Sequence, residues 1–484
     1  MRWRIVLHII GALTLCVGLT MIFPLFFSLY YQDSGIIPLT QSMIITSAVG
    51  LGMFLLFRDR EENKGLSHRE GMAIVALGWV GAGFFGSLPF YLGDVFPCYV
   101  DCFFESLSGF TTTGASVMTE IEHNAKGILF WRSLTHWLGG MGIIVLSLAI
   151  LPFLGVGGMQ LYKAEVPGPV PDKLKPRIKD TALVLWKVYL LFSAIEAVLL
   201  MFGGMDLFDS LCHTFGTLAT GGFSTKNSSV AYFQSAYIDY VITAFMIIAA
   251  INFSLHYQLI KGRPLLMWRD PEFRFFGVIT LIITAIITIS VYAATDYDSI
   301  AESFRYTSFQ VASIMSTTGY ATADYEIWPA VAQGLLLLCM FLGGCAGSTS
   351  GGMKHLRIML LFKQAYREVF RIIHPRSVNR VKLGKTVVQP ETMTDILGFC
   401  VLWLGLFVIC GLIVAASGVD VVSSFAASLA CIGNIGPGIG SVGPTDNYAH
   451  IPALGKWALI FCMLLGRLEI YTVVVLCVPE FWRK

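Results

Sequence analysis

Four short loops that share one pattern decide how this chain folds. They read Thr111-Thr112-Thr113-Gly114-Ala115, Ala219-Thr220-Gly221-Gly222-Phe223, Ser316-Thr317-Thr318-Gly319-Tyr320 and Gly433-Asn434-Ile435-Gly436-Pro437. Aligned on the fourth residue of each, a glycine, the loops recur about every hundred residues, and each lies between long apolar segments. A repeat of this length indicates one structural unit that is present four times.

A segment too short to cross a membrane precedes each loop. These segments are Tyr99–Phe110, Asp206–Leu218, Ser299–Met315 and Asp420–Ile432. An α-helix needs about 20 residues to span a bilayer, so each segment must enter and return on the same side. Backbone of this kind is tolerated only where protein buries it or where it lines water. Because Asp206, Ser299 and Asp420 suit helix N-caps, we expect short helices that enter from outside and loops around a central aqueous path.

The remaining sequence is typical of an all-α integral membrane protein. Of its 484 residues 55% are hydrophobic and only 13% are charged, whereas soluble chains carry about 25% charged residues. A net charge of +2 without a basic block excludes nucleic acid as a partner. Ten segments are long enough to span: Ile5–Tyr30, Ile36–Phe57, Gly71–Leu92, Ile128–Leu154, Thr181–Gly203, Ala236–Ile260, Phe273–Ala294, Trp328–Phe362 with an interruption, Thr394–Ala416 and Ala453–Val478.

We therefore expect ten transmembrane helices, of which the first two form an N-terminal segment over 1–70. Four pore repeats, each a helix, a pore loop and a second helix, follow over 71–160, 161–270, 271–390 and 391–484. Most Lys and Arg residues fall on one side of this arrangement, which predicts a cytoplasmic location for both termini. The outer side is rich in carboxylates, which would favour cations at the outer mouth: Asp94, Asp101, Glu105, Asp206, Asp209, Asp298, Glu302 and Asp420.

The loops have the properties of a selectivity filter for potassium. Rings of backbone carbonyls replace the hydration shell of the ion in such filters, and glycine permits the dihedral angles that present successive carbonyls inward. A single Gly-rich turn would indicate nothing, but four in register favour a filter. The expected potassium-binding residues are Thr112, Thr113, Gly114, Thr220, Gly221, Gly222, Thr317, Thr318, Gly319, Asn434, Ile435 and Gly436.

A glycine cluster interrupts the second helix of the third repeat. Its residues are Gly343, Gly344, Gly347, Ser348, Thr349, Ser350, Gly351 and Gly352. Each interior glycine costs a helix about 1 kcal/mol, so we expect a flexible loop that gates the pore below the filter. The alternative is close helix packing through small residues. A phosphate-binding P-loop is excluded because Met353 occupies the lysine position, and Lys354 and His355 are expected to end the loop at the inner surface.

Arg467 lies deep within the last predicted span, where a charge is costly and indicates function. Facing the pore, it would form a positive barrier to cations; the alternative is an internal ion pair with Glu469. For Glu196, in the fifth span, we expect a buried protonated or hydrogen-bonded carboxylate. The basic loop 363–385 fits an anionic-lipid contact and a docking surface for a cytosolic regulator equally well.

Long motifs resemble the Trk-type potassium uptake family over essentially the whole chain. Besides the four loops they are WLGGMGIIVLSLAILP from Trp137, GVGGMQLYKAEVPGP from Gly155, FLGGCAGSTSGGMK from Phe341 and LLGRLEIYTVVVL from Leu464. The resemblance implies a pseudo-fourfold potassium-channel fold, a homodimer and a cytosolic ring of nucleotide-binding, TrkA-like regulatory subunits. In that superfamily a glycine at position 114 goes with potassium, and rubidium would serve as a surrogate. The fourth loop departs from the pattern at Asn434-Ile435-Gly436, which implies a less symmetric filter.

The sequence thus predicts potassium uptake across the cytoplasmic membrane, with potassium as substrate and no cofactor in the chain. The alternative is a secondary transporter that symports potassium with protons or sodium. Such proteins usually show two inverted repeats with broken helices, whereas this sequence shows four parallel repeats and one evident break. An enzyme is not expected, since no Ser-His-Asp or HExxH arrangement occurs.

Overall fold

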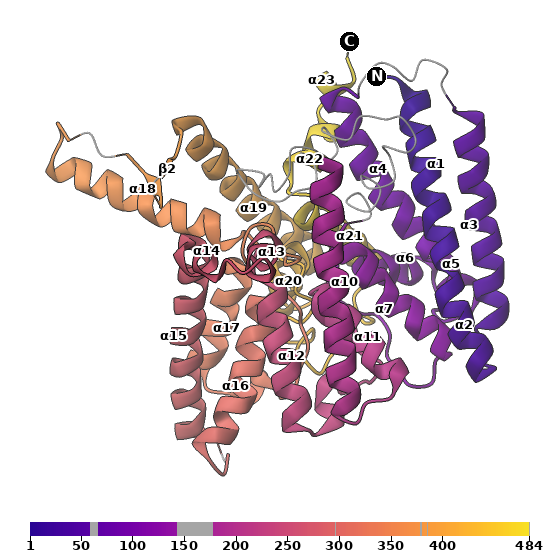
Figure 1. Cartoon of the computed structure of the whole chain (residues 1–484), viewed down its shortest axis with the longest axis horizontal. Coiled ribbons are helices and arrows are strands. Elements are labelled where there is room, and N and C mark those ends of the chain that lie inside the picture. Colours follow the sequence, from indigo (N-terminus) through magenta and orange to yellow (C-terminus); the bar gives the residue numbers. More distant parts are fainter. Residues whose placement is uncertain (59–65, 143–177, 296, 378–379, 385, 484) are drawn as a thin grey trace.

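The structure is a computed structural model that describes residues 1–58, 66–142, 178–295, 297–377, 380–384 and 386–483. Several expectations lie partly or wholly outside these residues: the second half of the span Ile128–Leu154, most of the motif that begins at Trp137, the motif that begins at Gly155, the boundary between the repeats over 71–160 and 161–270, and three positions of the basic loop 363–385. The described chain is mostly helical (Figure 1). Its one strand pair joins β1 (Lys382–Leu383) to β2 (Thr386–Val387).

Two antiparallel N-terminal helices flank the pore repeats (Figure 1). The first runs through α1 (Trp3–Thr20) and α2 (Ile22–Tyr31), and the second is α3 (Ile36–Leu56). A Cβ on Gly50 would lie 2.4 Å from the Leu15 amide nitrogen, so the two backbones touch there, as is common between membrane helices. Both chain ends lie at one end of the molecule, where the rings of Trp3 and Trp482 stack with centroids 5.7 Å apart.

The remaining elements follow the fourfold order of the repeats. The first repeat contains α4 (His68–Gly86), α5 (Leu88–Leu92), α6 (Tyr99–Phe110) and α7 (Lys126–Gly140). The second contains α10 (Ile178–Phe202), α11 (Leu207–Leu218), η2 (Ser229–Phe233), α12 (Ala236–Ala249), α13 (Phe253–Ile260) and α14 (Pro264–Arg269). The third contains α15 (Pro271–Ala294), α16 (Ile300–Met315), η3 (Tyr325–Ile327), α17 (Ala330–Leu342) and α18 (His355–Ile373). The fourth contains α19 (Pro390–Ala416), α20 (Val421–Ile432), α21 (Ala453–Arg467), α22 (Tyr471–Val474), η4 (Val475–Cys477) and α23 (Pro479–Trp482).

The short helices begin and end where their capping signals predict. In α11, α16 and α20 the residue before the helix accepts a hydrogen bond from a backbone N–H of the first turn. The distances are 2.6 Å to Asp206, 3.2 Å to Ser299 and 2.9 Å to Asp420. The first short helix, α6, has no side-chain cap. Local capping chemistry therefore positions three of the four helices that carry the loops.

Six helices among the described residues are long and apolar enough to span a membrane, or eight if two bent pairs each count as one span. These eight agree with eight of the ten predicted spans. The span Ile128–Leu154 begins in α7 and continues beyond the described residues. The span Trp328–Phe362 consists of α17 and α18 with the glycine cluster between them. The count of ten therefore stays a prediction.

The break in the third repeat is not the only one, which corrects the sequence analysis. The second helix of repeat 2 bends by 104° between α12 and α13, and that of repeat 4 by 116° between α21 and the segment that starts with α22. Asn252 caps the new helix of repeat 2 by accepting from the Ser254 N–H at 2.8 Å. In repeat 4, Glu469 and Ile470 both have positive φ, which a continuous helix cannot accommodate.

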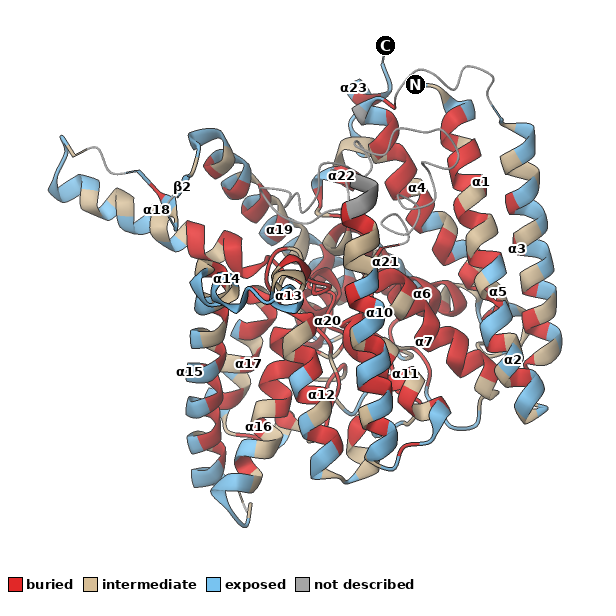
Figure 2. Ribbon diagram, in the orientation of Figure 1, coloured by how far each residue is buried: buried red, intermediate tan, exposed pale blue. Residues whose placement is uncertain are grey.

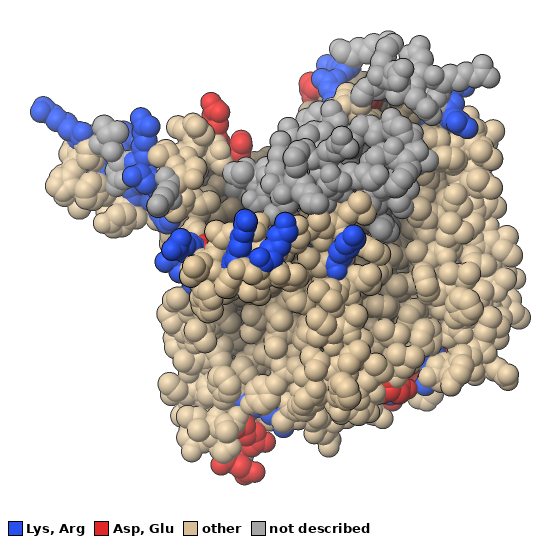
Figure 3. All heavy atoms as spheres, viewed as in Figure 1, with Lys and Arg blue, Asp and Glu red and all other residues tan. Residues whose placement is uncertain are grey.

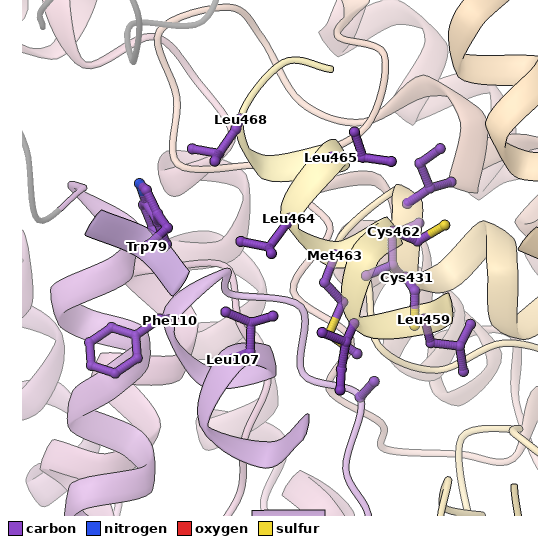
Figure 4. Packing of buried hydrophobic residues seen from close by; sticks show 14 of the residues in the cluster. Trp79, Leu107, Phe110, Cys431, Leu459, Cys462, Met463, Leu464, Leu465 and Leu468 are labelled. Atoms are coloured by element: carbon purple, nitrogen blue, oxygen red, sulfur yellow. The ribbon is translucent and has the colours of Figure 1, made fainter. Parts of the chain in front are cut away.

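Buried residues concentrate where the repeats meet (Figure 2). The short helices α6, α11 and α20 are mostly buried, whereas α3 and α15 expose large apolar residues such as Leu56 and Leu281 on their outward faces. Exposed apolar faces on long helices suit contact with lipid. In the core, the side chains of α21, including Leu464 and Met463, pack beside Leu107 of α6 and Cys431 of α20 (Figure 4). Helices from the first and the fourth repeat thus share one core.

Candidate functional site: four loops and the segment beneath them

The four loops have the same backbone conformation. Each short helix ends in a Schellman motif, in which two successive N–H groups bond back to carbonyls of the last turn. The outer bond of this motif joins Thr113 to Ser108, Gly221 to Gly216, Thr318 to Ser313 and Ile435 to Ala430, at 2.8 to 2.9 Å. The residue before each donor is left-handed, with φ between 51° and 61°, and so is the following glycine. The sequence repeat is therefore a repeat of local geometry.

The loops also form a closed ring. A Cβ on Gly114 would lie 2.0 Å from the carbonyl oxygen of Gly221, and one on Gly222 would lie 2.0 Å from that of Thr318. A Cβ on Gly319 would meet the Ile435 oxygen at 2.1 Å, and one on Gly436 would close the ring 2.8 Å from Thr113. Each glycine thus touches the carbonyl that precedes the glycine of the next repeat. Only a residue without a side chain permits this approach.

The left-handed residues before the ring differ in how they are held. Threonine is β-branched and rarely adopts positive φ, so Thr112, Thr220 and Thr317 store strain. Thr317 Oγ1 accepts a bond from Gly351 N–H at 2.7 Å, whereas Thr112 Oγ1 has no hydrogen-bond partner among the described residues. In the fourth loop Asn434 Nδ2 donates to Thr113 Oγ1 at 2.9 Å and to the Met463 carbonyl at 3.0 Å.

The glycine cluster forms a folded loop directly against the ring. It leaves α17 at Gly343, which has φ +69°, and it enters α18 at His355. Besides the bond from Gly351 to Thr317, Thr349 Oγ1 donates to the Leu218 carbonyl at the end of α11, at 2.9 Å. A Cβ on Gly351 would lie 2.3 Å from the Gly433 carbonyl oxygen, beside the fourth loop. The cluster thus contacts the loops or short helices of repeats 2, 3 and 4.

Arg467 joins this loop to the first repeat. Its guanidinium donates to the Thr349 carbonyl at 2.7 Å and to the carbonyls of Gly139 and Gly140 at the end of α7, at 2.7 and 3.0 Å. Arginine presents several donors in one rigid plane, so a single side chain can hold carbonyls from two repeats. Arg467 itself belongs to repeat 4. All four repeats therefore meet at this cluster.

A cavity of about 90 Å³ lies between these groups. Its lining includes Gly140 and Met141 after α7, the loop from Gly347 to Gly352, and Arg467. Lys354 also lines it, which corrects one expectation. Lys354 and His355 do end the loop, but both are buried rather than placed at the inner surface, and Lys354 Nζ donates to the Ser350 carbonyl.

Glu469, which the sequence analysis considered as the alternative ion-pair partner of Arg467, has another partner. Glu469 pairs with Arg357 of α18, which also lies over the ring of Phe399. Glu196 is fully buried in α10, as expected for that carboxylate. The described part of the basic loop belongs to an arm of α18 and the two strands that projects from the helical body (Figure 1).

Two of the expected outer carboxylates do not face the mouth. Glu105 is buried in an ion pair with Arg132 at 2.6 Å, and Asp101 pairs with Lys456 at the same distance. The sequence analysis assigned no basic partner to either carboxylate. Arg132 lies inside α7, however, and a charge one turn into a predicted span was the signal that could have indicated its partner.

Comparison with known proteins assigns this architecture to a family. The Trk system potassium uptake protein TrkH of Salmonella typhimurium is 43% identical over 487 residues and covers 100% of both chains. TrkG of Escherichia coli K12 is 35% identical over 99% of both. The crystal structure of the potassium transporter TrkH from Vibrio parahaemolyticus superposes with a TM-score of 0.90 at 38% identity over both full chains. The family profile named TrkH, cation transport protein, matches residues 38–484, so this chain is a member of the TrkH family of membrane cation transport proteins.

Proposed function

We propose that this protein conducts potassium into the cell across the cytoplasmic membrane, through a filter built from the four loops. The observation that carries the proposal is the closed ring, in which each glycine touches a backbone carbonyl of the next repeat. Successive carbonyls in the loops would replace the hydration shell of a bare cation. Thr112 to Gly114, Thr220 to Gly222, Thr317 to Gly319 and Asn434 to Gly436 are the proposed binding residues. Relatives of both TrkH and TrkG type are potassium uptake proteins, which supports potassium as the ion.

The loop from Gly343 to Gly352 and Arg467 are the proposed gate. The loop touches the underside of the ring, and the guanidinium joins it to the end of α7. A positive charge held there would repel cations that leave the filter. We propose that this arrangement is a closed state and that opening requires the loop to separate from Thr317 and Arg467.

Orientation and repeat boundaries follow the same proposal. Both termini would be cytoplasmic, with the N-terminal pair over 1–70 and pore repeats over 71–160, 161–270, 271–390 and 391–484. On the face shown in Figure 3, Lys and Arg side chains gather in the half that carries the termini, and a patch of Asp and Glu lies at the opposite end. Retention of basic residues on the cytoplasmic side supports this orientation.

The proposed partners are a second copy of the chain and a cytosolic, nucleotide-binding regulatory subunit. The projecting helix α18 exposes large apolar residues at its far end, which would be covered in a homodimer: Phe362, Tyr366, Val369, Ile372 and Ile373. The same arm carries Lys363, Arg367 and Arg371, which suit an acidic partner or anionic lipid on the cytoplasmic side. Regulation would have to come from such a partner, since the sequence contains no nucleotide-binding motif.

Coupled symport of potassium with protons or sodium stays the second candidate. The second helices of repeats 2 and 4 are broken as well as that of repeat 3. Broken helices are typical of secondary transporters. Uptake of rubidium-86 into proteoliposomes that contain only this protein separates the two. Uptake down the gradient, competed by potassium more than by sodium and insensitive to a pH gradient, is expected for a pore. Uptake that requires a proton or sodium gradient would establish the symporter instead.

A further inference from the structure

Just outside the ring, each loop is fastened by the preceding repeat. The attachment point is the carbonyl of the residue two positions after the filter glycine. The Ser116 carbonyl of loop 1 accepts from Tyr448 N–H of repeat 4 at 2.8 Å, and the Ala321 carbonyl of loop 3 accepts from Ala231 N–H of repeat 2 at 3.1 Å. The Gly438 carbonyl of loop 4 accepts from the Tyr325 hydroxyl of repeat 3 at 2.6 Å. Three of the four attachments therefore use neutral donors from outer connecting segments.

Loop 2 is fastened differently. Its Ser224 carbonyl accepts from Arg132 Nη1 at 2.9 Å, and Arg132 belongs to the helix α7 of repeat 1. The guanidinium is 2% exposed and lies over the ring of Phe223, 3.6 Å from its centroid. Its other nitrogens reach Glu105 Oε1 at 2.6 Å and Ser116 Oγ at 3.0 Å. One buried cation thus contacts the outer ends of loops 1 and 2 at once.

Glu105 completes the connection on the side of loop 1. Its carboxylate accepts from Ser116 Oγ and from Val117 N–H, both at 2.9 Å, in addition to Arg132. Glu105 lies nine residues before Gly114, and the equivalent positions of the other repeats are occupied by His213, Gln310 and Ala427. His213 Nε2 lies 3.0 Å from Ser224 Oγ, and Gln310 Nε2 donates to the Ala323 carbonyl at 2.9 Å. The side chain at this position is therefore a carboxylate in an ion pair in repeat 1, a polar histidine or glutamine in repeats 2 and 3, and an apolar alanine in repeat 4.

We propose that Glu105 and Arg132 are positioning residues for ion selectivity that lock loops 1 and 2 at a fixed separation. Two carbonyl approaches are the closest in the ring: an added Cβ would lie 2.0 Å from the Gly221 oxygen at Gly114 and 2.0 Å from the Thr318 oxygen at Gly222, and the first of these lies between these same two loops. Their spacing sets the size of the cage that a bare cation must fill, and among the supports described above only Arg132 contacts both loop 1 and loop 2. The inference rests on the proposed filter and names the residues that hold one of its two most tightly packed junctions.

The test compares neutralised ion pairs in full-length protein reconstituted into proteoliposomes. The double variant Glu105→Gln/Arg132→Gln removes both charges, so that no buried charge is left without its partner. We expect rubidium-86 uptake to persist, while the preference for potassium over sodium as competitor falls by at least about threefold, since charge-assisted hydrogen bonds are replaced by weaker ones. Arg132→Lys keeps the charge but loses the planar fork, so it should lower the same ratio with the protein folded.

The matched control is the pair Asp239–Arg305, which has the same 2.6 Å separation and joins α12 to α16, with Asp239 buried and Arg305 partly exposed. Asp239→Asn/Arg305→Gln should keep the parent ratio. A parent ratio in the Glu105 and Arg132 variants would overturn the inference, as would an equal fall in the control. Gly114→Ser, measured in parallel, tests the filter itself: if it alters the ratio while the Glu105 and Arg132 variants do not, only the positioning role is wrong. A parent protein without preference for potassium would overturn the proposed filter instead.

Discussion

The ring of loops and the region directly beneath it follow opposite rules. In the ring, four segments from different repeats share one helix ending, one pattern of dihedral angles and one contact to the next repeat. Beneath it, the second helices of repeats 2, 3 and 4 are interrupted in ways that are not the same. Repeat 2 bends by 104°, repeat 3 inserts the loop from Gly343 to Gly352, and repeat 4 bends by 116° just after Arg467.

This difference separates two physical requirements. A cage of carbonyls for a spherical ion needs equivalent contributions from all sides, so each repeat has to keep the same backbone. A barrier across one axial path needs only one segment and one charge. In the proposed function the loop of repeat 3 and Arg467 of repeat 4 supply these. We therefore expect that selectivity and gating can be altered separately by mutation.

The largest effect is expected where the ring tolerates no side chain. Gly114→Ser should lower the preference for potassium over sodium at least about tenfold, because its Cβ would lie 2.0 Å from the Gly221 oxygen and the loops must separate. Competition of rubidium-86 uptake measures the ratio. Gly334→Ala is the control, since a Cβ there meets nothing within 4 Å, and it should keep the parent ratio. An unchanged ratio in Gly114→Ser would count against the filter.

The second largest effect is expected at Arg467, in the region beneath the ring where the repeats differ. Arg467→Ala removes three bonds that join the loop to α7, so uptake without any regulatory partner should rise about tenfold, equivalent to about 1.4 kcal/mol of barrier. The ratio of potassium to sodium should stay constant. Arg467→Lys, which keeps the charge without the planar fork, should give an intermediate rate. Folded protein with unchanged uptake would show that Arg467 is structural.

A smaller effect is expected where the two regions touch. Gly351→Ala places a Cβ 2.3 Å from the Gly433 oxygen and should push the loop away from the ring. We expect basal uptake to rise about threefold, because the hydrogen bond from Gly351 to Thr317 weakens. Gly405→Ala on the lipid-facing helix α19 meets nothing within 4 Å and serves as control. Reduced uptake with a folded protein would argue that the loop does not block the path.

The smallest effect concerns the strain stored in the ring. Thr112→Asn replaces a β-branched residue at φ +51° by one that tolerates this conformation, so the free energy of unfolding should rise by up to about 1 kcal/mol. The reverse change, Asn434→Thr, loses the bonds to Thr113 and Met463 and should lower it by about 1–2 kcal/mol. Thermal unfolding in detergent measures both. If both variants changed the free energy of unfolding equally and in the same direction, the left-handed residues of the four loops would not be strained alike.

The short helices before the loops could be predicted from the sequence, because they depend on interactions between neighbouring residues. The short helices follow from apolar length and from capping at Asp206, Ser299 and Asp420. The bends at Ala250 and Ile470 could not be predicted in this way, because no Gly or Pro lies at either break and the nearby contacts come from the distant loop of repeat 3. Cys345 N–H donates to the Ala250 carbonyl at 2.8 Å, and Arg467, just before the second break, donates to the Thr349 carbonyl at 2.7 Å. Glu105 was assigned to the outer side for a similar reason, since only the folded chain shows that it is buried against Arg132.

The sequence alone established a helical membrane protein and predicted four pore repeats, because hydrophobic length, capping and glycine position act over a few residues at a time. The tertiary structure decided which carbonyl each glycine touches, that Arg467 holds carbonyls of repeats 1 and 3, and that a buried ion pair joins two loops. These contacts join residues tens to hundreds of positions apart. Their partners are selected by the closure of four units around one axis, which no local stretch of the chain encodes.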